Sequence, residues 1–188
     1  MNQPRSAEST TDGRTIMVRR TQPDDAEAFA ATLAGSRAVW GTMQLPFPSA
    51  AEWRQQLESN GDEIISLVAC VGAADGEVVG NLALLPEQHP RRRHVASFGM
   101  AVRDDWQGRG VGTTLLAAAM DLTDNWVQVT RVELDVYPDN EPAVRLYTAC
   151  GFEVEGTARG AVFRDGEYVD ILKMARIHPR LTSELPDA

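Results

Sequence analysis

A glycine-rich segment constrains this chain more than any other feature of its sequence. Residues 107–112 read QGRGVG and stand between a strand-like run, Ser97 to Val102, and a helix-like run, Thr113 to Trp126. Glycines let the main chain adopt positive φ and approach a ligand closely, and the first N–H groups of a helix present partial positive charge to an anion. The segment therefore predicts a loop that binds the phosphates of a cofactor.

The spacing within this loop excludes two other phosphate-binding loops. No Lys-Ser or Lys-Thr pair follows the glycines, so no lysine is placed to reach the phosphates of a nucleoside triphosphate. Gly112 follows Gly110 by two residues, whereas the dinucleotide fingerprint requires three. The pattern that remains is Q-x-x-G-x-G, from Gln107 to Gly112.

Length and composition indicate one globular domain without a polyanionic partner. We expect residues 1–15, which are polar, to form a disordered leader, residues 16–177 a single domain and residues 178–188 a tail. No apolar run is long enough for a secretion signal or a membrane span, which predicts a cytoplasmic protein with no membrane partner. The net charge of -9 disfavours nucleic acid but not a cationic or zwitterionic amine.

Cysteine and histidine usage predicts no bound metal. Cys70 and Cys150 lie far apart in the sequence, and the three histidines, His89, His94 and His178, are scattered. These spacings fit no metal or redox motif, so both cysteines are expected to be packing residues.

Periodicity and turn residues predict an α+β fold with three consecutive strands in the middle. The expected order is a strand at 16–19, a helix at 23–34, an irregular apolar segment at 37–48, a helix at 49–60, strands at 64–71, 78–85 and 95–102, the helix after the glycine loop, a strand at 132–136, a helix at 140–150, and strands at 152–154 and 169–174.

A second motif accompanies the loop. Residues 140–152 read NEPAVRLYTACGF, and this block together with Q-x-x-G-x-G resembles the signature of the GNAT acetyltransferase superfamily. The order of elements from Ile16 to Ala175 is similar as well. The resemblance implies the GNAT fold, a central, mixed, mostly antiparallel twisted sheet flanked by helices. Residues 42–46, 94–99 and 152–157 are most similar to bacterial members that acetylate free L-amino acids or related small amines.

The resemblance also implies acetyl-CoA as cosubstrate and a set of residues that bind it. The main chain of the strand before the loop would pair with the pantetheine arm, the loop would surround the pyrophosphate, and Asn140 would reach the pantetheine amides or cap its own helix. The implied residues are Met100, Ala101, Val102, Gln107, Gly108, Arg109, Gly110, Val111, Gly112, Thr113, Asn140 and Tyr147.

Tyr147 is the catalytic residue that the resemblance implies. A phenol with an ordinary pKa of about 10 is protonated at neutral pH and can donate to a departing thiolate. A base must also remove a proton from the attacking amine, and some relatives use a glutamate on the strand before the loop. Residues 95–102 contain no carboxylate, so His94, Glu133, Asp135 and a chain of water molecules remain alternatives.

The acceptor amine is expected near the irregular apolar segment. Trp40, Met43 and Leu45 would form an apolar wall and Arg37 would pair with a substrate carboxylate, unless these side chains only pack the first helices onto the sheet. The leading function is therefore an acetyl-CoA-dependent N-acetyltransferase acting on a small primary amine such as a free amino acid. The alternatives are a protein N-terminal acetyltransferase and a non-catalytic acyl-CoA-binding module. Under any of these functions, the protein is expected to be a monomer or a homodimer.

Overall fold

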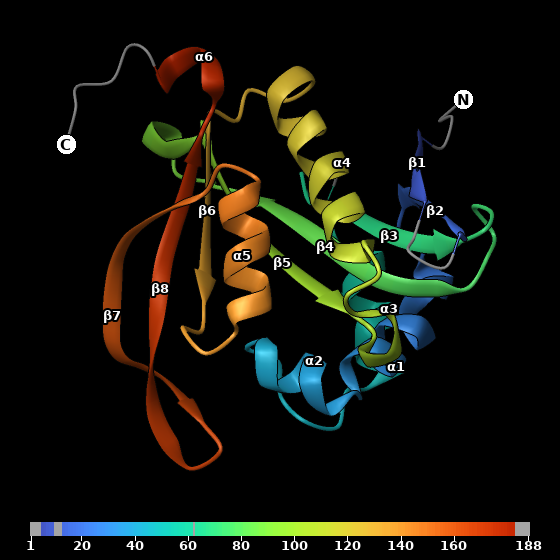
Figure 1. Ribbon diagram of the computed structural model, residues 1–188. Coiled ribbons are helices and arrows are strands. Elements are labelled where there is room, and N and C mark those ends of the chain that lie inside the picture. The colour runs from blue at the N-terminus through green and yellow to red at the C-terminus, as the bar shows by residue number, and fades with distance from the viewer. Residues whose placement is uncertain (1–4, 10–12, 62, 183–188) are drawn as a thin grey trace. The chain divides into compact units, whose positions relative to one another are not determined.

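The computed structural model describes residues 5–9, 13–61 and 63–182 (Figure 1). They form two compact units: the first contains the chain up to Leu84 together with Gly99–Ala119, and the second contains Leu85–Phe98 and the chain from Met120 onward. Strands β4 (Val78–Pro86) and β5 (Val95–Val102) and helix α4 (Val111–Asn125) each run from one unit into the other. Each unit has a core of its own.

Four antiparallel strands form the sheet of the first unit. Their order is β1-β2-β3-β4, with β1 at Arg5–Ser9, β2 at Thr15–Arg20 and β3 at Ile65–Val71. Strands β2, β3 and β4 confirm the predicted ones. Strand β1 lies within the segment expected to be a disordered leader. Its polar sequence shows no apolar alternation, and the strand is defined by main-chain pairing with β2. Residues 1–4 and 10–12 of that leader lie outside the described residues.

The helices of the first unit follow β2. They are the 3₁₀ turn η1 at Pro23–Asp25, α1 at Ala26–Leu33, α2 at Ser36–Gly41 and α3 at Ala50–Ser59. Helix α3 begins as its capping pattern predicted, because the Ser49 hydroxyl accepts from the Glu52 N–H at 3.3 Å. Helix α2 was not predicted, since five of its six residues lie inside the segment expected to be irregular.

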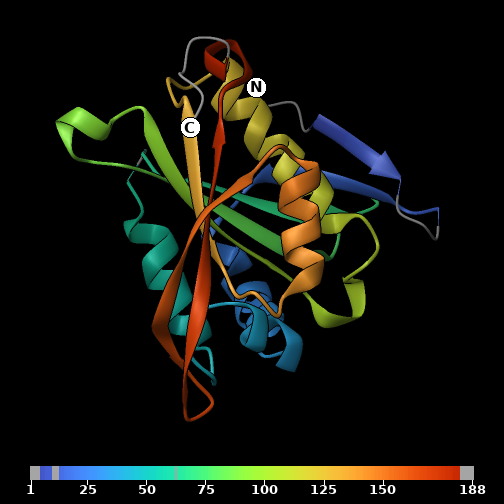
Figure 2. The ribbon, with the colours of Figure 1, turned by 60° about the vertical axis from the view of Figure 1, so that its left-hand side comes forward.

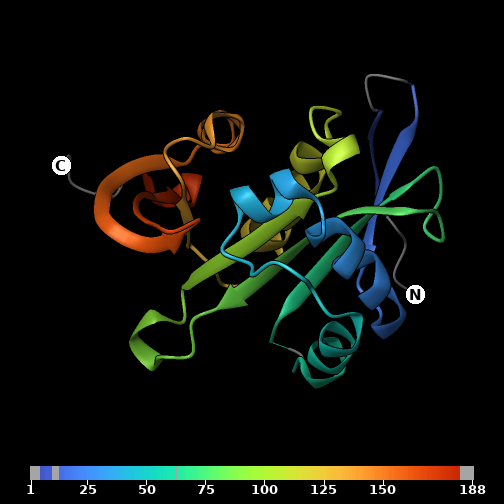
Figure 3. The ribbon, with the colours of Figure 1, turned by 90° about the horizontal axis from the view of Figure 1, so that it is seen from below.

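Helices cover both faces of β3 and β4 in the first unit. On one face, Phe29 of α1 packs with Val68 and with Trp53 of α3, and Figure 3 shows these two helices close together. On the other face, α4 approaches Gly80, where an added Cβ would lie 3.0 Å from Val111 Cγ1. Gly80 pairs with the neighbour of Val68, and adjacent strand residues point to opposite faces. The absence of a side chain at Gly80 thus lets the start of α4 pack closely on β4 (Figure 1).

The second unit contains a mixed sheet in the order β5-β6-β8-β7. Strand β6 (Arg131–Val136) runs parallel to β5 and antiparallel to β8 (Glu167–Ile177), which pairs antiparallel with β7 (Glu153–Arg164). Asp165 and Gly166 both have positive φ, 49° and 85°, as a two-residue hairpin turn requires. The turn confirms the prediction, and β7 and β8 extend well beyond the predicted strands (Figure 2).

The core of the second unit forms where helix α5 (Glu141–Ala149) packs beside this sheet (Figure 2). The rings of Phe98 of β5, Tyr147 of α5 and Phe152 contact one another at centroid distances of 5.6–6.0 Å. Two short elements complete the unit, the 3₁₀ turn η2 at Pro90–Arg92 and α6 at Pro179–Thr182. Strand β8 ends at Ile177, shortly before α6.

Candidate active site

The glycine loop occupies residues 107–110, between the 3₁₀ turn η3 (Asp104–Trp106) and α4. Gly108 and Gly110 have φ of 74° and 80°, which bulky L residues rarely adopt. A Cβ built on either residue would meet nothing within 4 Å, so the space beside this main chain is open. Gly112 lies inside α4, where φ is negative, so no unusual main-chain conformation requires a glycine there. Its expected role is to leave space for the cofactor to approach the main chain.

The first turn of α4 follows the loop directly. Its earliest internal hydrogen bond runs from the Thr114 N–H to the Gly110 carbonyl at 3.0 Å. The N–H groups of Val111, Gly112 and Thr113 precede this bond and have no acceptor within the helix. They are the first residues of a 15-residue helix, whose dipole favours an anion at this end.

The polar side chains of the loop are held by neighbouring residues of the first unit. Gln107 Nε2 donates to the Val102 carbonyl at 3.1 Å and to Asp104 Oδ1 at 3.3 Å. The guanidinium of Arg109 lies 5.1 Å from the ring centroid of the buried Trp106. These contacts fix the direction of both side chains before any ligand arrives.

Strand β5 leads into the loop with the three residues expected to pair with the pantetheine arm. Ala101 is buried, whereas Met100 and Val102 are half-buried. The Val102 carbonyl accepts from Gln107, so a ligand amide that pairs with this carbonyl shares it with the glutamine.

The two remaining residues that the resemblance implies for the cofactor are Asn140, which precedes helix α5 of the second unit, and Tyr147 on that helix. Asn140 is its N-cap, and its Oδ1 accepts from the Ala143 N–H at 3.4 Å, which confirms the capping role. Tyr147 is buried between Phe98 and Phe152, and burial raises the pKa of its phenol to about 12. The phenol is therefore protonated throughout the physiological range, as a proton donor must be.

The expected acceptor segment consists of α2 and the residues before α3. Trp40 and Met43 are about half exposed, at 47% and 50%, and Leu45 is exposed at 82%. Arg37, which is expected to pair with a substrate carboxylate, is exposed, and its Nη2 donates to the Asp104 carbonyl at 2.5 Å. The described arrangement thus offers exposed apolar surface here but already engages the arginine.

Comparison with known proteins assigns this arrangement to a family. The model of the acetyltransferase (GNAT) family matches residues 35–152, which include helix α2, the loop and helix α5. The chain belongs to the GNAT acetyltransferase family. It is an acetyltransferase with the GNAT fold, as the two motifs implied.

Two members of the GNAT family are similar to this chain in sequence. An L-amino acid N-acetyltransferase of Escherichia coli is 41% identical over 162 residues, which are 86% of this chain and 98% of that protein. A spermidine N(1)-acetyltransferase of Escherichia coli is 32% identical over 100 residues, 53% of each chain. The first match extends over nearly the whole relative, whereas the second covers about half of it.

Solved GNAT structures share the fold at lower identity. A putative phosphinothricin N-acetyltransferase aligns with a TM-score of 0.76 at 20% identity, covering 86% of this chain and 98% of that one. Spermidine N-acetyltransferase from Vibrio cholerae, in complex with CoA and spermine, aligns with a TM-score of 0.76 at 21% identity, covering 87% and 95%. Within the part of this chain that the structure describes, no helix is long and apolar enough to cross a membrane, and no cluster of His, Cys, Asp and Glu suits a metal ion.

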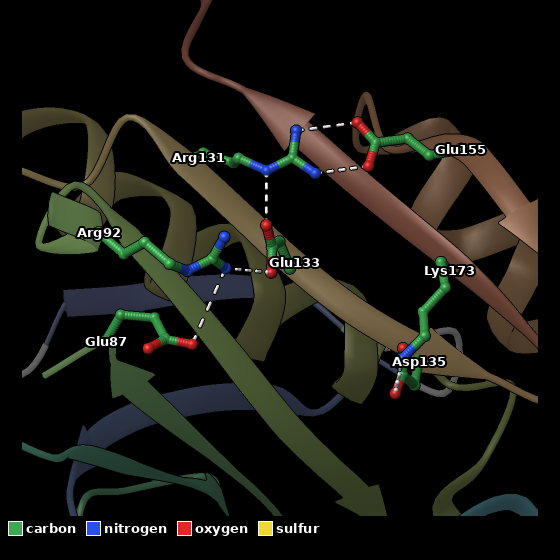
Figure 4. Close-up of polar contacts among 7 residues, drawn as sticks. All are labelled: Glu87, Arg92, Arg131, Glu133, Asp135, Glu155 and Lys173. Atoms are coloured by element: carbon green, nitrogen blue, oxygen red, sulfur yellow. Dashed lines mark hydrogen bonds and ion pairs between the residues drawn. The ribbon is translucent and has the colours of Figure 1, made fainter. Parts of the chain in front are cut away.

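Glu133, one candidate base, belongs to a network of charged residues in the second unit (Figure 4). Its carboxylate accepts from Arg131 Nε at 2.6 Å and from Arg92 Nη2 at 2.9 Å, while Arg131 also pairs with Glu155. Burial alone would raise the pKa of Glu133, but the two arginines outweigh it and hold this pKa below its usual value. A carboxylate that releases its proton so readily is a poor base for an amine.

The other two residue candidates are also placed unfavourably. Asp135, on the same face of β6, accepts from Lys173 Nζ at 2.7 Å and is exposed (Figure 4). His94 is exposed and precedes β5, at the opposite end of this strand from Val102. Glu133 and Asp135 are thus paired with basic side chains and His94 lies at the far end of β5, which leaves the water chain as the favoured alternative for the base.

Glu133→Gln tests this reading directly. We expect kcat/KM to stay within about 3-fold of the parent and to keep its rise between about pH 6 and pH 9, because the rise follows the amine rather than this carboxyl. Steady-state rates across this range check the prediction, with Asp135→Asn as a parallel variant of the same face. Loss of the pH dependence in Glu133→Gln alone would identify Glu133 as the base.

Sequence reasoning missed two residues that support the loop. Trp106 is buried beneath Arg109, and Asp104 contacts both Gln107 and the start of α2. The sequence signal that could have found them is their position just before the glycines. The contacts of Asp104 with α2 join residues more than 60 positions apart, so no local pattern records them.

Proposed function

We propose that this enzyme transfers the acetyl group of acetyl-CoA to the primary amine of a free amino acid. The observation that carries the proposal is the match to the Escherichia coli L-amino acid N-acetyltransferase, which spans 98% of that protein at 41% identity. An acidic chain, with a net charge of -9, does not repel a zwitterionic amine. The exposed apolar side chains of Trp40, Met43 and Leu45 offer surface for an amino-acid side chain.

The loop fits the cofactor that the proposal requires. The open space at Gly108 and Gly110 accommodates a phosphate beside the main chain, and the first N–H groups of α4 supply hydrogen-bond donors for it. Bound acetyl-CoA supplies the acetyl group activated as a thioester. We assign the pyrophosphate to residues 107–113, the pantetheine arm to residues 100–102 and Asn140, and no metal to the reaction.

Proton movement is assigned to Tyr147 and water. The phenol of Tyr147, with its pKa raised to about 12 by burial, keeps its proton until the thiolate leaves and then donates it. The amine loses its proton to a chain of water molecules, because Glu133 and Asp135 are already paired with basic side chains.

A cytoplasmic location belongs to the same proposal. Cys70 and Cys150 are both free, as cysteines are in reducing compartments. The proposal includes no nucleic-acid or membrane partner.

The experiment is a panel of acceptors assayed by thiol release with acetyl-CoA. The panel contains the free amino acids, short peptides beginning with the same residues, and spermidine. We expect turnover with one or more free amino acids and a kcat/KM at least about 10-fold lower for the matched peptides, because their carboxylate is replaced by an amide.

The acceptor panel and calorimetry with acetyl-CoA together separate the alternatives. In the panel, faster turnover of peptides than of free amino acids would assign the enzyme to protein N-termini, and faster turnover of spermidine would assign it to polyamines. Tight acetyl-CoA binding without turnover of any amine would indicate a binding module.

A further inference from the structure

Asp104 caps a helix that lies far from it in the sequence. Its Oδ2 accepts from the Arg37 N–H at 3.0 Å and its Oδ1 accepts from the Ala38 N–H at 2.9 Å. These N–H groups belong to the first turn of α2, whose own N-cap residue, Gly35, has no side chain to offer. The carboxylate thus takes the place of a local capping side chain.

Gly35 is required for space rather than for conformation. Its φ is -69°, which any residue adopts, but an added Cβ would lie 2.7 Å from the Asp104 Cγ and 2.8 Å from each carboxylate oxygen. An alanine at this position would therefore displace Asp104 from α2. Gly35→Ala gives a second way to break the cap without changing Asp104 itself.

The same carboxylate also contacts the cofactor loop. Asp104 Oδ1, which accepts from Ala38, accepts from Gln107 Nε2 as well, and this amide is also bonded to the Val102 carbonyl. In addition, the Asp104 carbonyl accepts from Arg37 Nη2 at 2.5 Å. One residue therefore joins the end of β5, the first residue of the loop and the start of α2, all within the first unit.

We propose that Asp104 is a positioning residue that couples occupation of the cofactor loop to the acceptor segment that begins with α2. This inference rests on the proposed function, which assigns the cofactor to the loop and the acceptor to residues 37–45. A ligand oxygen that accepts a hydrogen bond from the Gln107 amide withdraws this amide from Asp104 Oδ1. Asp104 Oδ1 then accepts from Ala38 alone, and its bond to the helix strengthens.

The coupling has a direction that follows from this geometry. Acetyl-CoA at the loop orders α2, and an ordered α2 holds the acceptor segment in place for the amine. Because coupling between two binding events is reciprocal, the acceptor also tightens the binding of acetyl-CoA by the same factor. A purely structural cap would stabilise α2 equally with and without the cofactor.

Hydrogen exchange measures the coupling without any turnover. In the parent protein, we expect acetyl-CoA to slow amide exchange in peptides covering Ser36–Gly41 by about 10-fold, within the usual range of coupling between sites. In Asp104→Ala and in Gly35→Ala, exchange in these peptides should be fast and should not respond to acetyl-CoA. Asp104→Asn, which keeps one carbonyl oxygen, should give an intermediate response.

Asp105→Asn is the matched control. Asp105 lies in the same turn and carries the same charge, but it pairs with Arg103 at 2.6 Å and is exposed. This variant should show the response of the parent. An equal response to acetyl-CoA in the parent and in Asp104→Ala would overturn the proposal, as would no response in the parent when calorimetry shows that acetyl-CoA is bound.

Kinetics provide an independent readout once an acceptor is known. Asp104→Ala should raise the KM of the acceptor by about 10-fold and leave kcat at saturating acceptor within about 2-fold, because Asp104 touches neither reacting group. An unchanged acceptor KM would contradict the coupling. Absence of acetyl-CoA binding by the parent would instead refute the proposed function, so the two failures are distinguishable.

Discussion

Replacing Gly110 with valine is expected to weaken acetyl-CoA binding at least about 100-fold while the protein remains folded. Gly110 has φ of 80°, and a β-branched residue held in this conformation costs about 1–3 kcal/mol. Nothing lies within 4 Å of an added Cβ, so the Cβ atom itself meets no neighbour in the free protein. The valine side chain instead fills the space assigned to the pyrophosphate. Calorimetry should show an affinity for acetyl-CoA at least about 100-fold weaker, equivalent to about 2.7 kcal/mol.

Gly72→Val is the matched control for this prediction. Gly72 has φ of 79°, is exposed, and likewise leaves an added Cβ without neighbours within 4 Å. It follows β3 in the same unit and has no assigned role in binding. Both variants should lose similar stability on thermal unfolding, but Gly72→Val should bind acetyl-CoA like the parent. Undiminished binding by Gly110→Val would show that the loop does not hold the phosphates.

Replacing Tyr147 with phenylalanine lowers kcat and leaves the KM for acetyl-CoA nearly unchanged. The ring still packs against Phe98 and Phe152, so the substitution removes the proton donor and little else. General acid catalysis contributes about 10²- to 10⁴-fold, and a thiolate is a fair leaving group, so we expect a loss near the lower end of this range. The pKa of Tyr147, raised to about 12 by burial, also predicts that the parent loses no activity through this group below about pH 10.

Tyr137→Phe is the comparison for the Tyr147 variant. Tyr137 is buried in the same unit, its pKa is also raised by burial, and Arg164 lies over its ring at 4.2 Å. Removal of its hydroxyl should leave kcat within about 2-fold, since it has no part in the assigned proton transfer. If steady-state thiol release is the same for Tyr147→Phe and the parent at every pH, the proton donor must be water or another residue.

Local sequence signals were sufficient for the glycine loop and for helix α5. The strand before the loop, the glycines and the helix after it stand next to one another in the sequence, so their arrangement follows from spacing alone. Asn140 caps α5 through a bond to a residue three positions away, which a single motif records. The fold class could be predicted as well, because the order of elements along the chain and the two motifs resemble one family.

Long-range contacts account for what the sequence did not show. Helix α2 has six residues, too few for a periodic pattern, and its cap comes from Asp104 rather than from a neighbouring residue. Strand β1 pairs with β2 through the main chain, and such pairing leaves no specific pattern of side chains in the sequence. Glu133 alternates correctly along β6, but the arginines that lower its pKa include Arg92, 41 positions away.

The remote cap of α2 has a consequence for biosynthesis. Asp104 follows Arg37 by 67 residues, which the ribosome adds in about 3 to 13 s at typical rates of synthesis. During that interval α2 lacks its cap, and the apolar side chains that follow it, Met43, Leu45 and Phe47, emerge on an unanchored segment. The nascent chain therefore presents the proposed acceptor segment to chaperones and proteases before the residue that caps α2 has been made.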